Sequence, residues 1–358
     1  ITLDGDAWGT SASGITQGKD KTNAIFAEVD IPLLEDVPLV KSLNLNASGR
    51  YTDVDSYGSD TTYKAGLNWE ITDTVRLRAG HGTSFRSPAL FELYLAGQTS
   101  FIGQRSVDPC LGWGAELDAG NISQELADNC AADGVAPDQA GTITATVFSG
   151  GGAGYLKAET SDTTTVGLIW SPEFADLKIS ADYFEINVED EVGQLSAAQI
   201  VAGCYYSDSF PNDPLCRQFD RDPIMGHVDN IKASYINIAQ QENRGWDLSI
   251  QYRTEIPWGE LIVDTQHTFQ IGDSYKLYTD SEDINTNGEL GDPKWTGRLS
   301  ATLLRGDWEY YYNVNIIGEA DNYDGYGGNT ASYRGEEVRV VLHADRVLYH
   351  TLSASYFF

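Results

Sequence analysis

The sequence predicts an all-β fold, namely a transmembrane antiparallel β-barrel with long extracellular loops and short periplasmic turns. Three observations lead to this fold class. Apolar and polar residues alternate with a period of two in many segments, and short and long connections between these segments alternate along the chain. In addition, no apolar run approaches the roughly 18 residues of a membrane-spanning helix.

The alternation is clearest in five segments. In the segment 246–253, the apolar residues Trp246, Leu248 and Ile250 are separated by polar residues. Such alternation places the apolar side chains on one face of a strand and the polar ones on the other. The same pattern occurs at 43–52, 63–70, 261–271 and 310–316. Strand signals of this kind along the chain predict about 12 to 14 strands.

The connections between these strands differ in length in a regular way. Short ones with turn-forming residues fall at 70–74, 171–176, 254–260 and 305–307, whereas long ones span about 86–159, 191–230, 272–293 and 319–337. When the strands are numbered in order, the short connections lie at one end and the long ones at the other. Outer-membrane barrels have this arrangement, with short periplasmic turns and long extracellular loops.

Tryptophan residues mark the end with the short connections. Those within a few residues of a short turn are Trp69, Trp170, Trp258 and Trp308. Because Trp and Tyr concentrate at membrane interfaces, we expect these four to form a periplasmic girdle. The alternative is a large soluble β protein, whose strands would alternate but whose turns need not segregate.

The formal net charge is −30, because 23 Lys and Arg residues stand against 53 Asp and Glu residues. This acidity argues against nucleic acid as a partner, since the phosphate backbone would be repelled. The acidic residues concentrate in the long loops, for example at 273–289 and 319–324. An acidic outer surface can attract divalent or polycationic ligands, and the alternative is that the charge only keeps the loops soluble and apart.

Four cysteines lie in the two longest loops, two in each: Cys110, Cys130, Cys204 and Cys216. Four cysteines allow three connectivities. Pairing within each loop, Cys110–Cys130 and Cys204–Cys216, is the simplest, because each bridge closes a short segment and the cell surface is oxidising. A zinc site is not expected, since no CxxC occurs and no His lies near either pair. The alternative is four reduced, buried thiols.

One segment resembles a metal site. Asp283, Asn285 and Asn287, followed by Gly288, match the first half of a calcium loop. The position where an EF-hand carries Glu is Lys294, so an EF-hand is excluded. A looser calcium site at these three residues is one expectation, and an ordinary Asn-Gly turn is the other. No further cofactor is expected.

The sequence contains no catalytic motif of the GxSxG, HExxH or Cys/His type, and we therefore expect no enzyme activity. The histidines are scattered, and we expect His81 and His267 to face the lumen or to belong to a girdle rather than to act as bases.

Ligand binding is expected in the loops and the upper lumen. Aromatic residues of the long loops are the candidates for it: Trp113, Tyr155, Tyr205, Tyr206, Tyr323 and Tyr326. Stacking platforms of this kind suit sugars, catecholates or planar cofactors. The alternative for each residue is that its ring packs against other loop residues.

Five segments resemble motifs of the TonB-dependent outer-membrane receptors. In the order of that family they are Gly82–Tyr94, Leu156–Leu168, Asp182–Asp190, Asn237 with Glu242–Asp247, and Gly291–Gly297. Each is weak alone, but together they resemble the family over about residues 20–358. The resemblance places Arg86 of the first motif at the lumen wall near the family's plug domain, which implies a structural role.

The resemblance implies a barrel of roughly 22 strands that is occluded by an N-terminal plug. Such receptors lie in the outer membrane of Gram-negative bacteria and import a scarce or bulky nutrient, for example a siderophore, a vitamin or an oligosaccharide, with energy from the TonB complex. The plug, the TonB box and the last hairpin are not found in this chain. We therefore expect residues 1–358 to be part of one barrel domain, cut at both ends.

The implied partners are outer-membrane lipid, the nutrient ligand, and the TonB complex through the missing N-terminal region. A second hypothesis is a surface scaffold whose disulfide-linked loops bind a partner, for example a surface lipoprotein.

Overall fold

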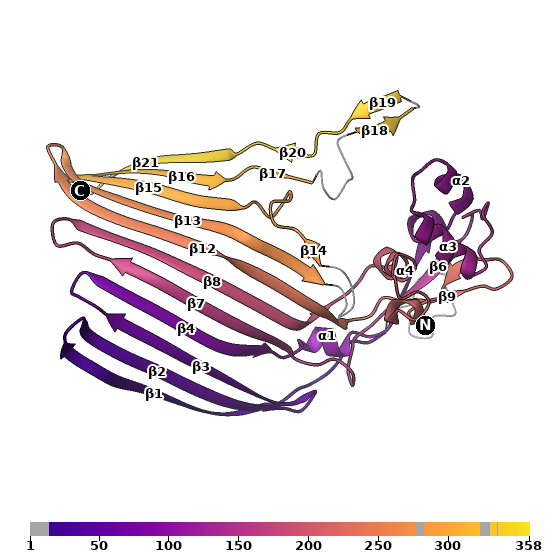
Figure 1. Cartoon of the computed structure of the whole chain (residues 1–358), viewed down its shortest axis with the longest axis horizontal. Helices are drawn as coiled ribbons and strands as arrows, with labels where there is room; N and C mark the ends of the chain where they lie inside the picture. The colour runs from indigo at the N-terminus through magenta and orange to yellow at the C-terminus, as the bar shows by residue number, and fades with distance from the viewer. Residues whose placement is uncertain (1–13, 277–282, 323–329, 335) are drawn as a thin grey trace.

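A computed structural model describes residues 14–276, 283–322, 330–334 and 336–358. Nearly half of them belong to one large antiparallel sheet whose long strands follow one another in chain order (Figure 1). The long strands are β1 (Thr22–Val37), β2 (Val40–Val54), β3 (Gly58–Glu70), β4 (Val75–Arg86), β7 (Glu159–Trp170), β8 (Asp176–Gly193), β12 (Ile236–Ile256), β13 (Gly259–Lys276), β15 (Trp295–Arg305), β16 (Trp308–Ile317) and β21 (Val347–Tyr356). With the two-residue β14 (Ile284–Asn285), the described part of the sheet has 12 strands, at the lower end of the expected count.

Short and long connections lie at opposite ends of this sheet. Tight turns join β1 to β2, β3 to β4, β7 to β8, β12 to β13, and β15 to β16 at one end, where the C-terminus also lies (Figure 1). The other end carries the connections 87–158, 194–235, 277–294 and 318–346. One exception is the turn 55–57 between β2 and β3, which is short but lies at the end with the long loops.

The register sorts the alternating side chains onto two faces. A row of directly paired residues crosses nine strands and is apolar or aromatic throughout: Ile31, Leu45, Leu67, Ala79, Val166, Tyr183, Trp246, Phe269 and Trp295. On the opposite face, a paired row contains Asn68, Arg78, Gly167, Asp182, Asp247, Thr268 and Thr296. The first face is the lipid-facing wall of a membrane barrel and the second faces its lumen.

The apolar face has the height of a bilayer core. On β12 it runs from Trp246 to Ile256, which at about 3.3 Å per residue is roughly 33 Å along the strand. A strand tilt of about 40° reduces this to roughly 25 Å. The four tryptophans predicted for the periplasmic girdle all lie at the end with the tight turns. At the loop end, Trp295 stacks on Phe269 with ring centroids 6.2 Å apart, and Tyr183 contacts Trp246 at 5.4 Å.

His81 and His267 lie on the apolar face and not in the lumen. His81 is paired with Ala65 and Thr164, and His267 with Leu248 and Gly297. The ring of His267 lies 5.8 Å from that of Trp295 and accepts a hydrogen bond from its indole N–H at 3.2 Å. Of the two expectations for these histidines, the lumen-facing one is therefore wrong.

The long connections carry short helices, for which the sequence shows no extended helical periodicity. They are α1 (Leu90–Tyr94), α2 (Trp113–Asp118), α3 (Gln124–Ala132) and α4 (Ala197–Tyr205). In the described part of the chain, no helix combines the length and the apolar character needed to cross a membrane.

Candidate functional site

The two longest loops fold together into one compact unit, here called the extracellular module, which comprises residues 98–149 and 195–233. A small sheet joins them: β11 (Ile231–Lys232) pairs in parallel with β6 (Thr144–Ser149), which pairs antiparallel with β5 (Gln98–Gly103). Helices α2, α3 and α4 gather around it at the loop end of the large sheet (Figure 1).

The module has a hydrophobic core of its own. Both loops contribute buried side chains to it, including Val107, Leu126, Val135, Ala145, Val147, Ile200, Val201, Leu215, Val228 and Ile231. Helix α4 begins with a capping box, in which Ser196 and Gln199 satisfy each other's backbone N–H groups, and it then turns Ile200 and Cys204 into the core. The core therefore joins segments that the sequence presents as separate polar loops.

Both expected disulfides, Cys110–Cys130 and Cys204–Cys216, are present. Their sequence separations are 20 and 12 residues, so each bridge lies within one loop. Cys110, Cys130 and Cys204 are buried in the shared core. Each disulfide thus stabilises one loop, and the core holds the two loops together.

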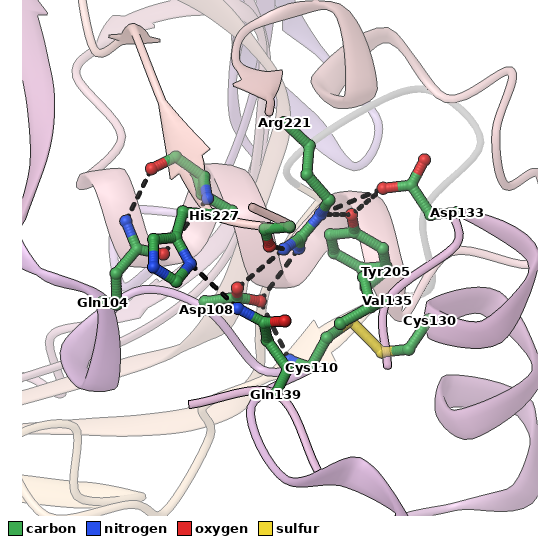
Figure 2. Close-up of polar contacts among 12 residues, drawn as sticks. Gln104, Asp108, Cys110, Cys130, Asp133, Val135, Gln139, Tyr205, Arg221 and His227 are labelled. Carbon is green, nitrogen blue, oxygen red and sulfur yellow. Dashed lines mark hydrogen bonds and ion pairs between the residues drawn. A yellow bond between two sulfur atoms is a disulfide. The ribbon is translucent and has the colours of Figure 1, made fainter. Parts of the chain in front are cut away.

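Arg221 is the main polar link between the loops (Figure 2). Its side chain is 7% exposed and donates to both carboxylate oxygens of Asp108, at 2.8 and 2.9 Å, and the Asp108 side chain is fully buried. Arg221 also donates to the Tyr205 hydroxyl at 2.6 Å and to Asp133 at 3.1 Å. The Tyr205 hydroxyl in turn donates to Asp133. A buried carboxylate is tolerated when it is paired and hydrogen-bonded in this way.

Burial and hydrogen bonding together set the protonation states in this cluster, and burial dominates at Tyr205. It raises the pKa of the Tyr205 hydroxyl far above its usual range, so the hydroxyl remains neutral. Burial opposes the charge on Arg221, but the hydrogen-bonded Asp108 carboxylate outweighs this and raises the Arg221 pKa. Arg221 therefore stays cationic and Tyr205 stays neutral at physiological pH, which makes the cluster a structural element.

Two glutamines cross-link the loops further (Figure 2). Gln104 is fully buried, and its side chain donates to the Val228 carbonyl at 2.6 Å and accepts from the Val228 N–H at 3.1 Å. Gln139 Nε2 lies 2.9 Å from Nδ1 of His227. Sequence reasoning missed these residues because no local motif marks them. The available signal was the helical spacing of Ala197, Ile200, Val201 and Cys204, which indicates a buried surface in the second loop.

The predicted ligand-binding aromatics have different environments. Tyr205 is 0% exposed and stacks on Phe210, so its ring belongs to the core, and its prediction as a binding platform is corrected. Trp113 packs against the core and donates to the Val135 carbonyl at 2.9 Å. Tyr155 and Tyr206 are 53% and 55% exposed. Tyr323 and Tyr326 lie outside the described residues.

The predicted calcium ligands make contacts of their own. Asp283 forms an ion pair with Lys276 at 3.4 Å, and the Asn285 side chain accepts from the Asn287 N–H at 3.0 Å. Gly288 follows with a φ of +98°, as an Asn-Gly turn requires. Among the described residues, no group of three or more His, Cys, Asp or Glu side chains could hold a metal ion. The contacts of Asn285 and Gly288 are those of an ordinary Asn-Gly turn, and a calcium site at Asp283, Asn285 and Asn287 stays a prediction.

Residues of the family-like motifs fasten the first loop to the sheet. Arg86 donates to both carboxylate oxygens of Glu159, each at 2.5 Å, and contacts Glu92 of α1 at 3.1 Å. Glu92 accepts from the Ala89 N–H at 2.6 Å and so begins α1. Arg86 thus clamps the start of the loop to its end, in keeping with the structural role that the resemblance implies.

Asn237 fastens both loops at once. Its side chain accepts from the Lys157 N–H at 2.9 Å and donates to the carbonyls of Lys157 and Asp190 at 3.1 and 2.6 Å. These contacts join the ends of β7, β8 and β12, from which the two loops of the module leave the sheet. The module is therefore held at its base by side chains from separate strands.

The lumen face beneath the module contains a groove of about 730 Å³. Arg78 and Asp182 line it and form a bidentate ion pair, with both distances 2.7 Å. Gly167 lies between them in the register, and a Cβ atom there would collide with the Asp182 carboxylate. Asp247, next in the row, accepts from the Thr268 hydroxyl at 2.6 Å. The charged and hydroxyl groups of this lining suit a polar ligand or a polar protein surface, and Phe184 adds an aromatic ring to it.

Comparisons with known proteins agree with this architecture. Residues 3–356 match the family model described as "TonB dependent receptor-like, beta-barrel". A mutant of the ferric enterobactin receptor from Pseudomonas aeruginosa is similar with a TM-score of 0.56 and 16% identity, over 94% of this chain and 37% of that one. The siderophore receptor PirA from Acinetobacter baumannii is similar with a TM-score of 0.56 and 12% identity, over 96% of this chain and 42% of that one. The chain therefore spans 37–42% of the length of these structures.

Proposed function

Because the chain belongs to the TonB-dependent receptor β-barrel family of the Gram-negative outer membrane, we propose that it is part of a receptor that imports a scarce, bulky nutrient with energy from the TonB complex. We propose further that residues 1–358 supply strands and two long loops to one barrel domain. The observation that carries the proposal is the extracellular module, which stands above a sheet with one lipid face and one hydrogen-bonding face.

A siderophore is the substrate class that we favour. Solved structures similar to this chain are named as ferric enterobactin and siderophore receptors. The charge of the loops narrows the class, because residues 87–158 and 194–235 contain 13 acidic and 5 basic residues, a net charge of −8. Such a field repels anions and attracts neutral or cationic ligands. A neutral or cationic ferric trihydroxamate therefore fits better than a strongly anionic ferric catecholate.

We propose that Tyr206 of the module and Tyr155, which follows its first segment, contact the ligand, since both residues are more than half exposed. Replacing Tyr206 by Ala should weaken binding about two- to tenfold, the usual worth of one aromatic contact. Tyr206→Phe is the matched control, because it keeps the ring and should bind nearly as the original protein does. Equal affinity of all three proteins would remove Tyr206 from the site.

Growth and uptake experiments test the proposed function. A strain without the gene is given iron only as a ferric trihydroxamate or only as ferric enterobactin. We expect the strain to lose radioactive iron uptake from the trihydroxamate, to regain it with the cloned gene, and to lose it again when the TonB complex is removed. Uptake of ferric enterobactin alone would contradict the charge argument. No gene-dependent uptake of any nutrient would contradict the transport function and favour the surface scaffold.

A further inference from the structure

We propose that the outer face of the barrel wall binds a neutral saccharide, at a site above the aromatic residues Tyr183 and Trp246. Two adjoining grooves with volumes of about 360 and 290 Å³ form the site. Asp162, Asn187 and Glu189 line both grooves and therefore lie at its centre. None of these three residues belongs to the extracellular module or to the lumen groove.

The register places the site on the outer face of the sheet and outside the hydrocarbon layer. Along β8, Asn187 comes four residues after Tyr183 in the direction of the loops. Along β12, Glu242 lies four residues beyond Trp246 in the same direction. Because side chains alternate between the two faces, Asn187 and Glu242 share the face of the two aromatic residues. Four strand residues, tilted by about 40°, rise roughly 10 Å above them.

Neighbouring strands bring planar polar side chains together at the centre of the site. Asn187 is paired directly with Asp162 on one side and with Glu242 on the other, and the Cβ atoms of such pairs are about 4.5–5.5 Å apart. Two residues further along β8, Glu189 accepts a hydrogen bond from the Gln240 amide at 3.4 Å. The Asn187 side chain has no hydrogen-bond partner within the described chain, so its amide is open to a ligand. Amides and carboxylates each present two polar atoms and can thus bind two neighbouring hydroxyl groups of one sugar.

The second groove lies where β3 and β4 part. Their ladder ends at the pair Lys64 and Gly82, although both strands continue toward the loops. The Tyr63 N–H donates instead to the Thr83 hydroxyl at 3.2 Å. Tyr63 is 49% exposed, and its hydroxyl lies 3.3 Å from Nε2 of His81 on the membrane side, so the ring forms the lower edge of the groove. An aromatic ring beside hydroxyl groups offers an apolar surface to one face of a sugar and hydrogen bonds to its rim.

The charges of the lining select a neutral sugar. The described lining of the two grooves contains one basic residue, Lys276, which forms an ion pair with Asp283 at 3.4 Å. Its acidic residues are Asp60, Asp162, Glu189, Glu242 and Asp283. Carboxylates accept strong hydrogen bonds from hydroxyl groups, but they repel phosphorylated or acidic sugars. A free oligosaccharide and the head of an outer-leaflet glycolipid both supply the hydroxyl groups that this lining binds.

A glycan array tests the proposal with the full-length receptor, purified from outer membranes in detergent and labelled. The array carries neutral oligosaccharides, anionic oligosaccharides of the same length, and the sugar released from the strain's own outer-leaflet glycolipid. We expect binding to neutral glycans and little to anionic ones. Binding of the released sugar alone would identify the glycolipid as the source, and binding of other neutral glycans alone would identify a free oligosaccharide.

Two variants locate the binding in the grooves. Asn187→Ala should weaken the affinity for a bound glycan about five- to thirtyfold in titrations, which is the worth of one or two hydrogen bonds. Glu189→Gln should raise binding of the anionic glycans, because it removes a negative charge from the centre of the site and keeps the shape of the side chain. A purely structural role of Glu189 would not change the preference between neutral and anionic glycans.

Asn68→Ala is the matched control, because this exposed asparagine lies on the lumen face of β3. It should bind glycans as the original protein does, and all variants should show the heat-modifiable gel migration of a folded barrel. Glycan binding is measured without transport, so its result is independent of the uptake experiments. Absence of binding to every glycan, a preference for anionic glycans, or unchanged affinity of folded Asn187→Ala would overturn the site.

Discussion

Replacing Arg221 by Met should unfold the extracellular module locally while the sheet stays intact. Met has no hydrogen-bond donor, so the fully buried Asp108 carboxylate would lose its cationic partner. It would keep the hydrogen bond that it accepts from the Cys110 N–H at 3.0 Å. Removing one partner of a buried ion pair costs about 3–5 kcal/mol, because the remaining charge is left uncompensated. The sheet should not be affected, since the buried residues of the module core lie in the two loops and the large sheet contributes Ile236, at the start of β12, to its edge.

Hydrogen exchange of the module amides measures this effect. A loss of 3–5 kcal/mol corresponds to exchange that is roughly 100- to 5,000-fold faster, at about 1.4 kcal/mol per factor of ten. Heat-modifiable gel migration should show an unchanged fraction of folded barrel. Arg217→Met is the matched control, because Arg217 is an exposed arginine of the same loop and its loss should cost less than about 0.5 kcal/mol.

A double variant identifies the cause. Arg221→Met combined with Asp108→Asn leaves no buried charge, so it should recover a large part of the lost protection. Two results would refute the reasoning: a loss of less than about 1 kcal/mol in Arg221→Met, or a double variant that exchanges as fast as the single one. Either result would mean that the buried charge of Asp108 is not what Arg221 stabilises.

Three further predictions concern the wall and the module. Leu248→Arg, on the lipid face, should destabilise the barrel by about 2–4 kcal/mol in denaturant titrations in lipid vesicles. Ser249→Arg, on the lumen face, should have a much smaller effect. Equal losses of stability in the two variants would contradict the assigned faces. Gly167→Ala should lower the fraction of barrel that shows heat-modifiable gel migration, because the new methyl group would collide with the Asp182 carboxylate. Gly49→Ala should leave this fraction unchanged, because the nearest neighbour of its Cβ atom would be 4.0 Å away. The pKa of Asp229 lies below its ordinary value of 3.8, because hydrogen bonds from backbone N–H groups outweigh its burial. Its contribution to module stability is therefore complete above about pH 4 and is lost as the pH falls through the lower folded pKa. Asp229→Asn should flatten the pH dependence of module hydrogen exchange in that window, and an unchanged profile would contradict this.

The strands could be predicted because their signal is local. Successive side chains of a strand point to opposite faces whatever the partner strand is, so the alternation around Trp246 and Leu248 already defines an apolar and a polar face. The expected disulfides followed in the same way, since Cys110 and Cys130 are only 20 residues apart and Cys204 and Cys216 only 12.

The module could not be predicted because its contacts are distant in sequence. Arg221 and Asp108 are separated by 113 residues, and Tyr205 and Asp133 by 72. In the sequence Tyr205 is one aromatic residue of a polar loop, equivalent to its neighbour Tyr206. In the structure the first is fully buried and the second is 55% exposed.

The sequence by itself determined that this chain forms the wall of an outer-membrane barrel, because period-two alternation, turn length and interfacial tryptophans act within one strand or one turn. Only the tertiary structure decided that two loops share one core, that Gly167 makes room for an ion pair between residues 104 positions apart, and that Asn187 lies between two carboxylates in a groove of the outer wall. Each of these features depends on contacts between side chains of different strands and loops, and no local sequence pattern specifies such contacts.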